Sequence, residues 1–128
     1  MPTAITHDIQ VTVQTTYSES HSNSEENFYF FIYEITIQNN SPYQVKLLRR
    51  HWHIIDTNLV KTEVEGEGVI GKQPLLESGD SFTYRSACNI SSPIGKMFGT
   101  YVFERISDGS TFDVLIPEFQ LAVPFVLN

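Results

Sequence analysis

The longest run of alternating side chains in this sequence is Tyr29-Phe30-Phe31-Ile32-Tyr33-Glu34-Ile35-Thr36-Ile37-Gln38. Its odd positions are all aromatic or isoleucine, whereas its even positions begin apolar and become polar from Glu34 onward. A period of two is typical of a β-strand with one face in the core. We therefore predict a long strand here, covered on both faces at its start and exposed to water on one face at its end.

The same alternation continues on both sides of this strand and is broken by short turn signals. Before it, Ile9, Val11 and Val13 alternate with polar residues. The turns after it are Asn39-Asn40-Ser41-Pro42, Glu77-Ser78-Gly79-Asp80 and the two-residue hairpin signal Asp108-Gly109. Seven or eight strands without helical spacing predict one all-β domain over residues 1–128. The expected fold is an antiparallel β-sandwich of the immunoglobulin or fibronectin type III kind, with a closed barrel as the alternative.

The third strand contains one change of phase. Its apolar side chains occupy one phase at Val45 and Leu47 and the other phase at Leu48, Trp52 and Ile54. A slip of one residue is what a β-bulge near Arg49 produces. With Trp52 facing the core, we expect Arg49, His51 and His53 to face outward together.

Further predictions concern the strands after this one. Residues 59–70 are expected to form a strand that ends in glycine-rich sequence, and a short last strand through 119–121 is expected between Pro117 and Pro124. Cys88 falls in the apolar phase of its own strand, so its thiol should face the core and be inert. As the only cysteine, it cannot form an internal disulfide.

The composition argues against several functions. Eight Lys and Arg against fifteen Asp and Glu give a net charge of −7 and a pI near 4.9, which disfavours nucleic-acid binding. The excess of carboxylates suits a cation or a basic protein surface as partner. The chain starts with neither a basic segment nor an apolar run, and its longest apolar stretch, residues 28–33, is far below the roughly 20 residues of a spanning helix. We expect a cytoplasmic protein that binds neither nucleic acid nor membrane.

The most specific local motif is Gly66-Glu67-Gly68-Val69-Ile70-Gly71-Lys72-Gln73, which satisfies G-x-G-x-x-G. Glycines at this spacing let backbone amides converge on phosphate oxygens, and Lys72 would add a positive charge. Nucleotide-binding motifs of this kind need a helix directly after the loop, whereas here Pro74 follows without helical periodicity. Glycines in a bulge and turn are therefore the favoured interpretation. The alternative is a nucleotide or polyphosphate site at Gly66, Gly68, Gly71 and Lys72.

Two groups of side chains resemble metal ligands. His51 and His53 would chelate a divalent metal if a neighbouring strand supplied a third ligand, but the sequence names none. Glu63, Glu65 and Glu67 line one face of a strand, and carboxylates suit hard cations. Surface histidines and a solvated acidic edge that discourages strand aggregation are the favoured interpretations, so no metal is assigned.

The sequence contains no recognisable catalytic set. It lacks the G-x-S-x-G elbow of serine hydrolases and any paired-carboxylate signature, and Cys88 has no local base. We therefore expect no catalytic residues, no cofactor and no enzyme activity.

Four ordered motifs resemble one known family. They are Leu47-Leu48-x-Arg50-His51-Trp52, Gly66-Glu67-Gly68-Val69-Ile70-Gly71-x-Gln73-Pro74, Ser92-Pro93-x-Gly95-x-Met97-x-Gly99-x-Tyr101, and Phe112 through Ile116-Pro117-x-Phe119-x-Leu121. Together they are similar to the ApaG family, also called CorD, from about Ile9 to Pro124. The resemblance implies a fibronectin-type β-sandwich, in agreement with the strand pattern.

The resemblance also implies a function. Bacterial members are linked by name to cobalt resistance and magnesium efflux, and by gene neighbourhood to diadenosine tetraphosphate hydrolysis, while related eukaryotic domains look like protein-binding modules. The family's proposed pyrophosphate contact maps onto Gly66, Gly68 and Gly71, whereas His53 departs from the aliphatic residue more usual there. We expect a module for an unidentified protein partner, linked to divalent-cation homeostasis, with a small-ligand sensor at the Gly66 to Lys72 loop as the alternative. The sequence leaves a homodimer open.

Overall fold

The computed structural model describes residues 1–124 and consists mainly of strands. The strands are β1 (Thr3–Thr6), β2 (Ile9–Tyr17), β3 (Tyr29–Asn39), β4 (Val45–Asp56), β5 (Lys61–Glu67), β6 (Leu75–Leu76), β7 (Ser81–Ile90), β8 (Ile94–Arg105) and β9 (Thr111–Ala122). Two single-turn 3-10 segments, η1 (Glu19–His21) and η2 (Ser24–Glu26), lie in the loop before β3. Within the described residues, no helix has the length and apolarity needed to cross a membrane.

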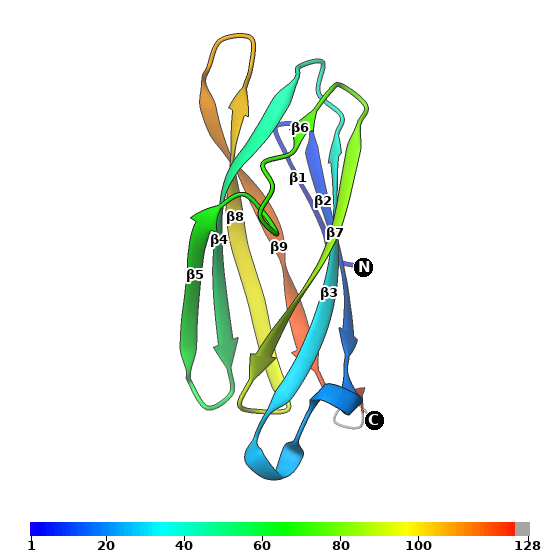
Figure 1. Cartoon of the computed structure of the whole chain (residues 1–128), viewed down its shortest axis with the longest axis vertical. Coiled ribbons are helices and arrows are strands. Elements are labelled where there is room, and N and C mark those ends of the chain that lie inside the picture. Colours follow the sequence, from blue (N-terminus) through cyan, green and yellow to red (C-terminus); the bar gives the residue numbers. More distant parts are fainter. Residues whose placement is uncertain (125–128) are drawn as a thin grey trace.

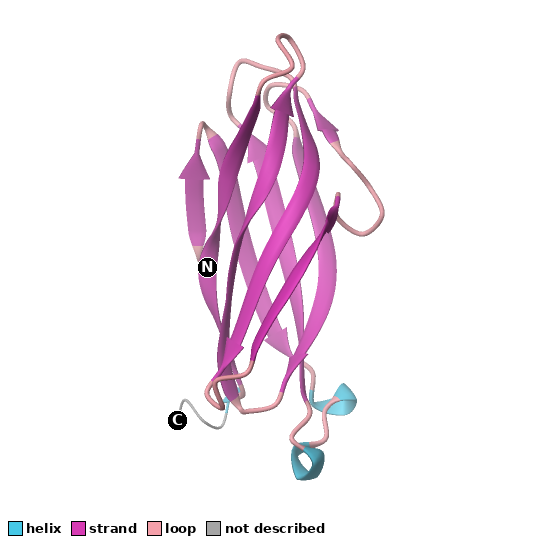
Figure 2. Ribbon diagram, turned by 90° about the vertical axis from the view of Figure 1, so that its left-hand side faces the viewer, coloured by secondary structure: helices cyan, strands magenta, loops and turns pink. Residues whose placement is uncertain are grey.

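The strands form two antiparallel sheets that pack face to face (Figures 1 and 2). One sheet has the order β1-β2-β3-β7, and the other has the order β5-β4-β8-β9 with β6 paired to β4. This confirms the predicted sandwich of the immunoglobulin or fibronectin type III kind. In residues 1–124, β5 pairs only with β4 and β7 only with β3, so the sheets do not close into a barrel. The structure has more strands than the expected seven or eight. β1 and β6 are too short to give a clear alternating pattern in the sequence.

The core lies between the sheets and follows the predicted phase of β3. The side chains of Tyr29, Phe31, Tyr33, Ile35 and Ile37 are all buried. On the opposite face of β3, Phe30 and Ile32 are half-buried, whereas Gln38 at the far end is exposed. The periodicity of this run therefore predicted both the strand and its buried face.

The predicted bulge lies in β4. Pairing with β8 shifts register between Leu47 and Arg49, so Leu48 is the extra residue. After the shift, Trp52 points inward with 3% of its surface exposed, and its ring packs 5.5 Å from that of Tyr33. The alternate residues His51 and His53 lie on the outer face of the sheet. The bulge thus sets which side chains of β4 reach the core and which reach solvent.

Three predicted boundaries were wrong. The expected strand over 59–70 is only β5, because Leu59 takes a positive φ of 62° before it and a tight turn follows Glu67. The last strand is not short, because β9 runs through Pro117. A register shift between β8 and β9 at this point leaves Pro117 outside the regular ladder, where its missing N–H costs little. The Asp108-Gly109 hairpin forms, but its connection extends over residues 106–110.

Candidate functional site

The glycine motif ends in a two-residue hairpin turn. The Val69 N–H donates to the Lys72 carbonyl over 2.8 Å, and the Lys72 N–H donates back to the Val69 carbonyl over 2.9 Å. The two residues between them, Ile70 and Gly71, have positive φ values of 45° and 76°. Positive φ at both central residues is the requirement of a type I′ turn. This segment is therefore a turn between β5 and β6, and the next element after it is a strand and not a helix.

The turn uses amides that an anion would need. Besides the N–H groups of Val69 and Lys72, the Gly68 N–H donates to the Leu48 carbonyl over 2.8 Å. Phosphate-binding loops instead leave several consecutive amides free for the ligand. The hydrogen bonding of this loop therefore favours a structural role for its glycines over an anion site.

Arg50 lies beneath this loop, and the sequence had singled it out only as part of the motif Leu47-Leu48-x-Arg50-His51-Trp52, without a role in a site. Its Nη1 donates to the carbonyls of Glu67 and Gly68, each over 3.0 Å. A Cβ at Gly66 would lie only 2.9 Å from Nη1, and a Cβ at Gly68 would overlap the Lys72 carbonyl. Two of the three motif glycines thus make room for the guanidinium and for the turn. After the bulge in β4, Arg50 has the same inward phase as Trp52. This phase is the sequence signal that could have predicted that Arg50 faces inward.

Arg50 also lines a cleft of about 390 Å³ on the open flank of the sandwich, which we define as the side where β5 and β7 are both edge strands. Thr62 and Val64 of β5 form one wall, and residues 86–89 of β7 form the other. Trp52 is among the residues between the two walls. Arg50 is the only charged side chain among the residues that line the cleft.

The other polar side chains of the cleft are neutral. Burial raises the pKa of Cys88 to about 12, so this thiol stays protonated, and its Sγ lies 3.4 Å from the Met97 sulfur. Its inward position was predicted. Burial also raises the pKa of Tyr33, against the opposite effects of the Ser86 hydroxyl and Arg50. The cleft therefore presents one cation and neutral hydrogen-bonding groups.

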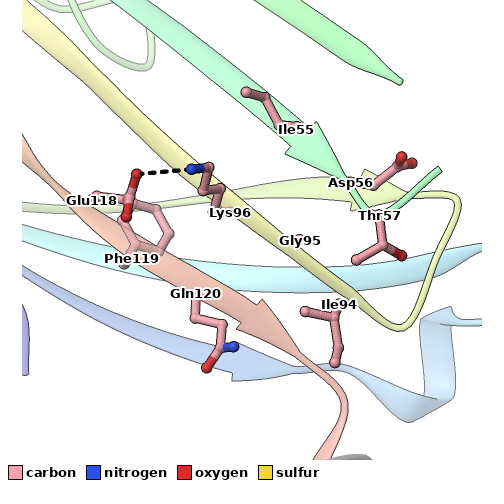
Figure 3. Close-up of a pocket in the computed structure, with 9 residues that line it drawn as sticks. All are labelled: Ile55, Asp56, Thr57, Ile94, Gly95, Lys96, Glu118, Phe119 and Gln120. Carbon is pink, nitrogen blue, oxygen red and sulfur yellow. Dashed lines mark ion pairs between the residues drawn. The ribbon is translucent and has the colours of Figure 1, made fainter. Parts of the chain in front are cut away.

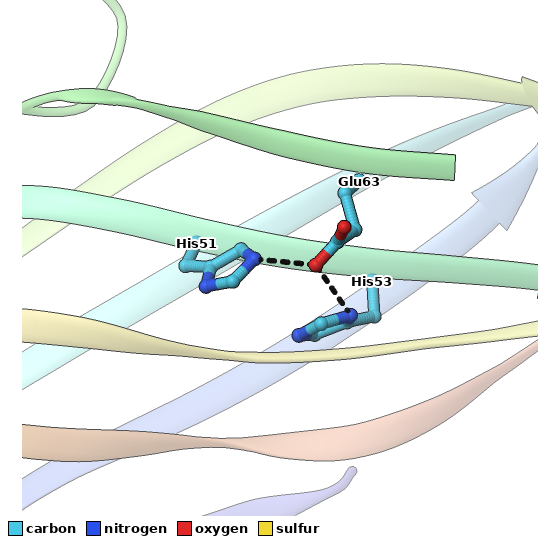
Figure 4. A group of neighbouring side chains, drawn as sticks. All are labelled: His51, His53 and Glu63. Atoms are coloured by element: carbon cyan, nitrogen blue, oxygen red, sulfur yellow. Dashed lines mark hydrogen bonds and ion pairs between the residues drawn. The ribbon is translucent and has the colours of Figure 1, made fainter. Parts of the chain in front are cut away.

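A second cluster lies on the outer face of β4 and β5, where Figure 4 shows His51, His53 and Glu63 converging. Strand pairing sets His53 opposite Glu63 and His51 opposite Glu65. The Glu63 Oε1 lies 3.0 Å from Nε2 of His51 and 3.5 Å from Nδ1 of His53. The histidine pair and the glutamates, which the sequence analysis treated as two separate candidate sites, therefore form one cluster. Sequence reasoning named Glu63 among the candidate carboxylates but did not place it beside the histidines, because only the register between β4 and β5 shows that they meet.

A shallow hollow of about 500 Å³ lies at the far end of β4 (Figure 3). Among its lining residues, Lys96 and Glu118 form an ion pair with an N to O distance of 3.4 Å. Asp56 is held by hydrogen bonds within the fold. The charged groups of this hollow thus already have partners, which makes it a weaker candidate for an ionic ligand.

Asp56 closes the turn between β4 and β5. Its carboxylate accepts backbone N–H groups from Asn58 at 2.9 Å, Val60 at 3.1 Å and Ser91 at 3.2 Å, together with the Ser91 hydroxyl. Burial alone would raise the pKa of Asp56, but these hydrogen bonds outweigh it and lower the pKa below its ordinary value. The charged form is therefore stabilised in the folded chain.

Replacing Asp56 with asparagine is expected to lower the free energy of unfolding by about 1–3 kcal/mol near neutral pH. Folding lowers the pKa of Asp56, so the charged carboxylate stabilises the fold fully at pH values above the pKa of Asp56 in the unfolded chain. This stabilisation is lost as the pH falls through the pKa of Asp56 in the folded chain. Urea unfolding at neutral and acid pH measures this, and the cost of D56N should shrink in acid. A cost that stays constant with pH would show that the charge of Asp56 has no role in stability.

The comparison with known proteins identifies the family. The ApaG domain family matches residues 19–105 of this chain. The chain belongs to the ApaG family. Protein ApaG of Sinorhizobium fredii is 47% identical over 121 residues, which cover 94% of this chain and 92% of the relative. Protein ApaG of Agrobacterium fabrum is 45% identical over 125 residues, which cover 98% of this chain and 95% of the relative.

A solved structure is also similar over almost the whole chain. The crystal structure of a Bordetella pertussis protein provisionally assigned as ApaA has a TM-score of 0.88 at 38% identity and covers 96% of each chain. The span that matches the ApaG domain contains β3 to β8. The glycine turn, the cleft and the His51 cluster therefore all lie within the ApaG domain.

Proposed function

We propose that this ApaG-family chain is a non-enzymatic interaction module that docks an extended segment of a protein partner on the open flank between β5 and β7. The observation that carries the proposal is that two edge strands border one cleft. Through this partner, the module would influence divalent-cation homeostasis. Support for that link comes from the family resemblance.

Edge strands suit this role because the backbone N–H and C=O groups along one side of each strand are not paired with another strand. A partner segment can pair with such an edge through main-chain hydrogen bonds, while its alternate side chains enter the neighbouring cleft. β7 is ten residues long and, in the described chain, is paired along one side only. It therefore offers a longer docking edge than β5, which has seven residues.

Arg50 gives the cleft a point of recognition. Both of its hydrogen bonds to the described residues use Nη1, so Nη2 and Nε can donate to an incoming acceptor. A carboxylate or carbonyl of the partner segment is the matching group. The high pKa of Cys88 supports the non-enzymatic interpretation, because a protonated thiol is a poor nucleophile.

Site-specific photo-crosslinking tests the proposal. A photoreactive residue at Ala87, exposed on β7, is expected to capture a discrete partner protein from cell extract, whereas one at Gln14, exposed on β2, is not. Arg50→Met should abolish the capture, and the matched control Arg49→Met should retain it because Arg49 is exposed on the outer face. Identical products from both positions, or capture that survives Arg50→Met in a folded variant, would contradict the proposal.

The alternative is a sensor for a nucleotide or polyphosphate at the Gly66 to Lys72 loop. It is favoured by the exposed Lys72 and by the open space beside Gly71, where a Cβ would meet no atom within 4 Å. Calorimetry with ATP and diadenosine tetraphosphate should then show saturable heat that Lys72→Gln abolishes. No heat at millimolar ligand would rule out the sensor.

A further inference from the structure

We infer that His51, His53 and Glu63 form a binding site for a divalent transition-metal ion on the outer face of β4 and β5. The inference does not depend on the docking flank. Glu63 projects from the face of β5 opposite to Thr62 and Val64, which line the cleft, and the two histidines project from the outer face of β4. Each of the three residues offers one ligand atom, and all three atoms lie within 4.8 Å of one another.

The distances between the ligand atoms fit a small ion. Metal bonds of about 2.0–2.2 Å to imidazole nitrogen and carboxylate oxygen place neighbouring ligands of a tetrahedral site about 3.4 Å apart. The Glu63 Oε1 is 3.0 Å from one imidazole nitrogen and 3.5 Å from the other. The two imidazole nitrogens, which lie within 4.8 Å of each other, would rotate toward each other to centre an ion among the three atoms. The remaining coordination position faces solvent and would hold water.

The fold holds these ligands in place before any metal binds. β4 lies between β5 and β8, and its pairing with β5 sets Glu63 directly opposite His53. The ring of His53 stacks on Phe98 of β8 at 4.9 Å and 12°, and the two imidazole rings lie 4.5 Å apart. Both histidine side chains are about one-third exposed. Ordering the site therefore costs less entropy than ordering fully mobile surface side chains.

Glu65 supplies the outer partner that metal-binding histidines usually have. Its Oε1 lies 3.3 Å from Nδ1 of His51, while Nε2 of the same ring faces Glu63. When the Nδ1–H donates to Glu65, the lone pair of the neutral ring lies on Nε2 and points at the metal position. Once a metal takes the place of a proton on Nε2, Glu65 is positioned to accept the hydrogen bond from Nδ1–H.

The ligand types indicate which ions would bind. Two imidazoles with one carboxylate suit Zn²⁺, Co²⁺ or Ni²⁺, whereas Mg²⁺ and Ca²⁺ prefer sites made wholly of oxygen. We therefore expect Zn²⁺ and Co²⁺ to bind with one ion per chain, and Mg²⁺ not to compete at equal concentration.

Calorimetry with Zn²⁺ and absorption spectra with Co²⁺ on the full chain test the site. His51→Gln, His53→Gln and Glu63→Gln should each weaken binding by at least about tenfold, and Glu65→Gln by about tenfold. The control His21→Gln, which alters an exposed histidine of η1, should leave affinity unchanged. Thermal melts without metal establish that each variant is folded.

Two results would show that no transition metal binds at this cluster. One is the absence of saturable Zn²⁺ binding to the unaltered chain. The other is binding that persists unchanged in folded variants of all three ligands, which would place the ion elsewhere. Mg²⁺ binding as tight as Zn²⁺ binding would contradict the assignment of the site to a transition metal.

Discussion

Replacing Trp52 with alanine is expected to lower the free energy of unfolding by about 3–5 kcal/mol, because it removes a large buried side chain and leaves a cavity. The indole is 3% exposed and packs edge-on against Phe119 at 5.9 Å and Tyr101 at 6.5 Å. Urea unfolding followed by circular dichroism measures the loss. Leu115→Ala is the matched control, because Leu115 is 56% exposed and should cost less than about 0.5 kcal/mol.

The fluorescence of the unaltered protein checks the same placement. Trp52 is the only tryptophan, so the native emission reports on this one site. We expect blue-shifted emission typical of a buried indole. Emission typical of an exposed indole, or a W52A cost as small as that of L115A, would contradict the position of Trp52 in the core.

Replacing Gly68 with alanine is expected to cost about 2–5 kcal/mol, because two unfavourable effects combine. Gly68 has a φ of 63°, which alanine adopts poorly, and the added Cβ would overlap the Lys72 carbonyl. The carbonyl of Gly68 also accepts from Arg50, so movement of this segment should disturb the cleft. Thermal and urea unfolding measure the loss.

Gly71→Ala is the matched control for Gly68→Ala. Gly71 also has a positive φ, of 76°, but a Cβ there meets open space, so only the backbone strain of about 1–2 kcal/mol remains. Equal costs at the two glycines would contradict the packing described for this turn. The contrast also matters for ligand studies. If a Gly68 variant loses function, a damaged turn is a sufficient explanation, and a lost anion contact does not follow.

The sequence predicted those parts of the fold that local periodicity controls. The inward face of β3, the bulge in β4 and the inward position of Trp52 all follow from alternation within single strands. The continuity of β9 through Pro117 did not, because a proline is tolerated there only through a register shift against β8. Register depends on which strands pair, and no single-strand pattern contains that information.

The same limit applies to the candidate sites. The glycine motif was visible as a pattern, and the lack of a following helix was predicted from Pro74. The contacts of Arg50 with the glycine motif and of Glu63 with the histidines were missed, because each contact crosses from β4 to β5 or to the turn after it. Sequence reasoning therefore located the residues of both clusters but not their partners.

Hydrogen exchange of the chain, alone and with its captured partner, is the sharpest check of docking at the open flank. Slower exchange confined to amides of β5 and β7 is the expected result, because an added strand pairs N–H groups that otherwise face water. Protection that falls on β1 and β2, with β5 and β7 unchanged, would contradict docking there.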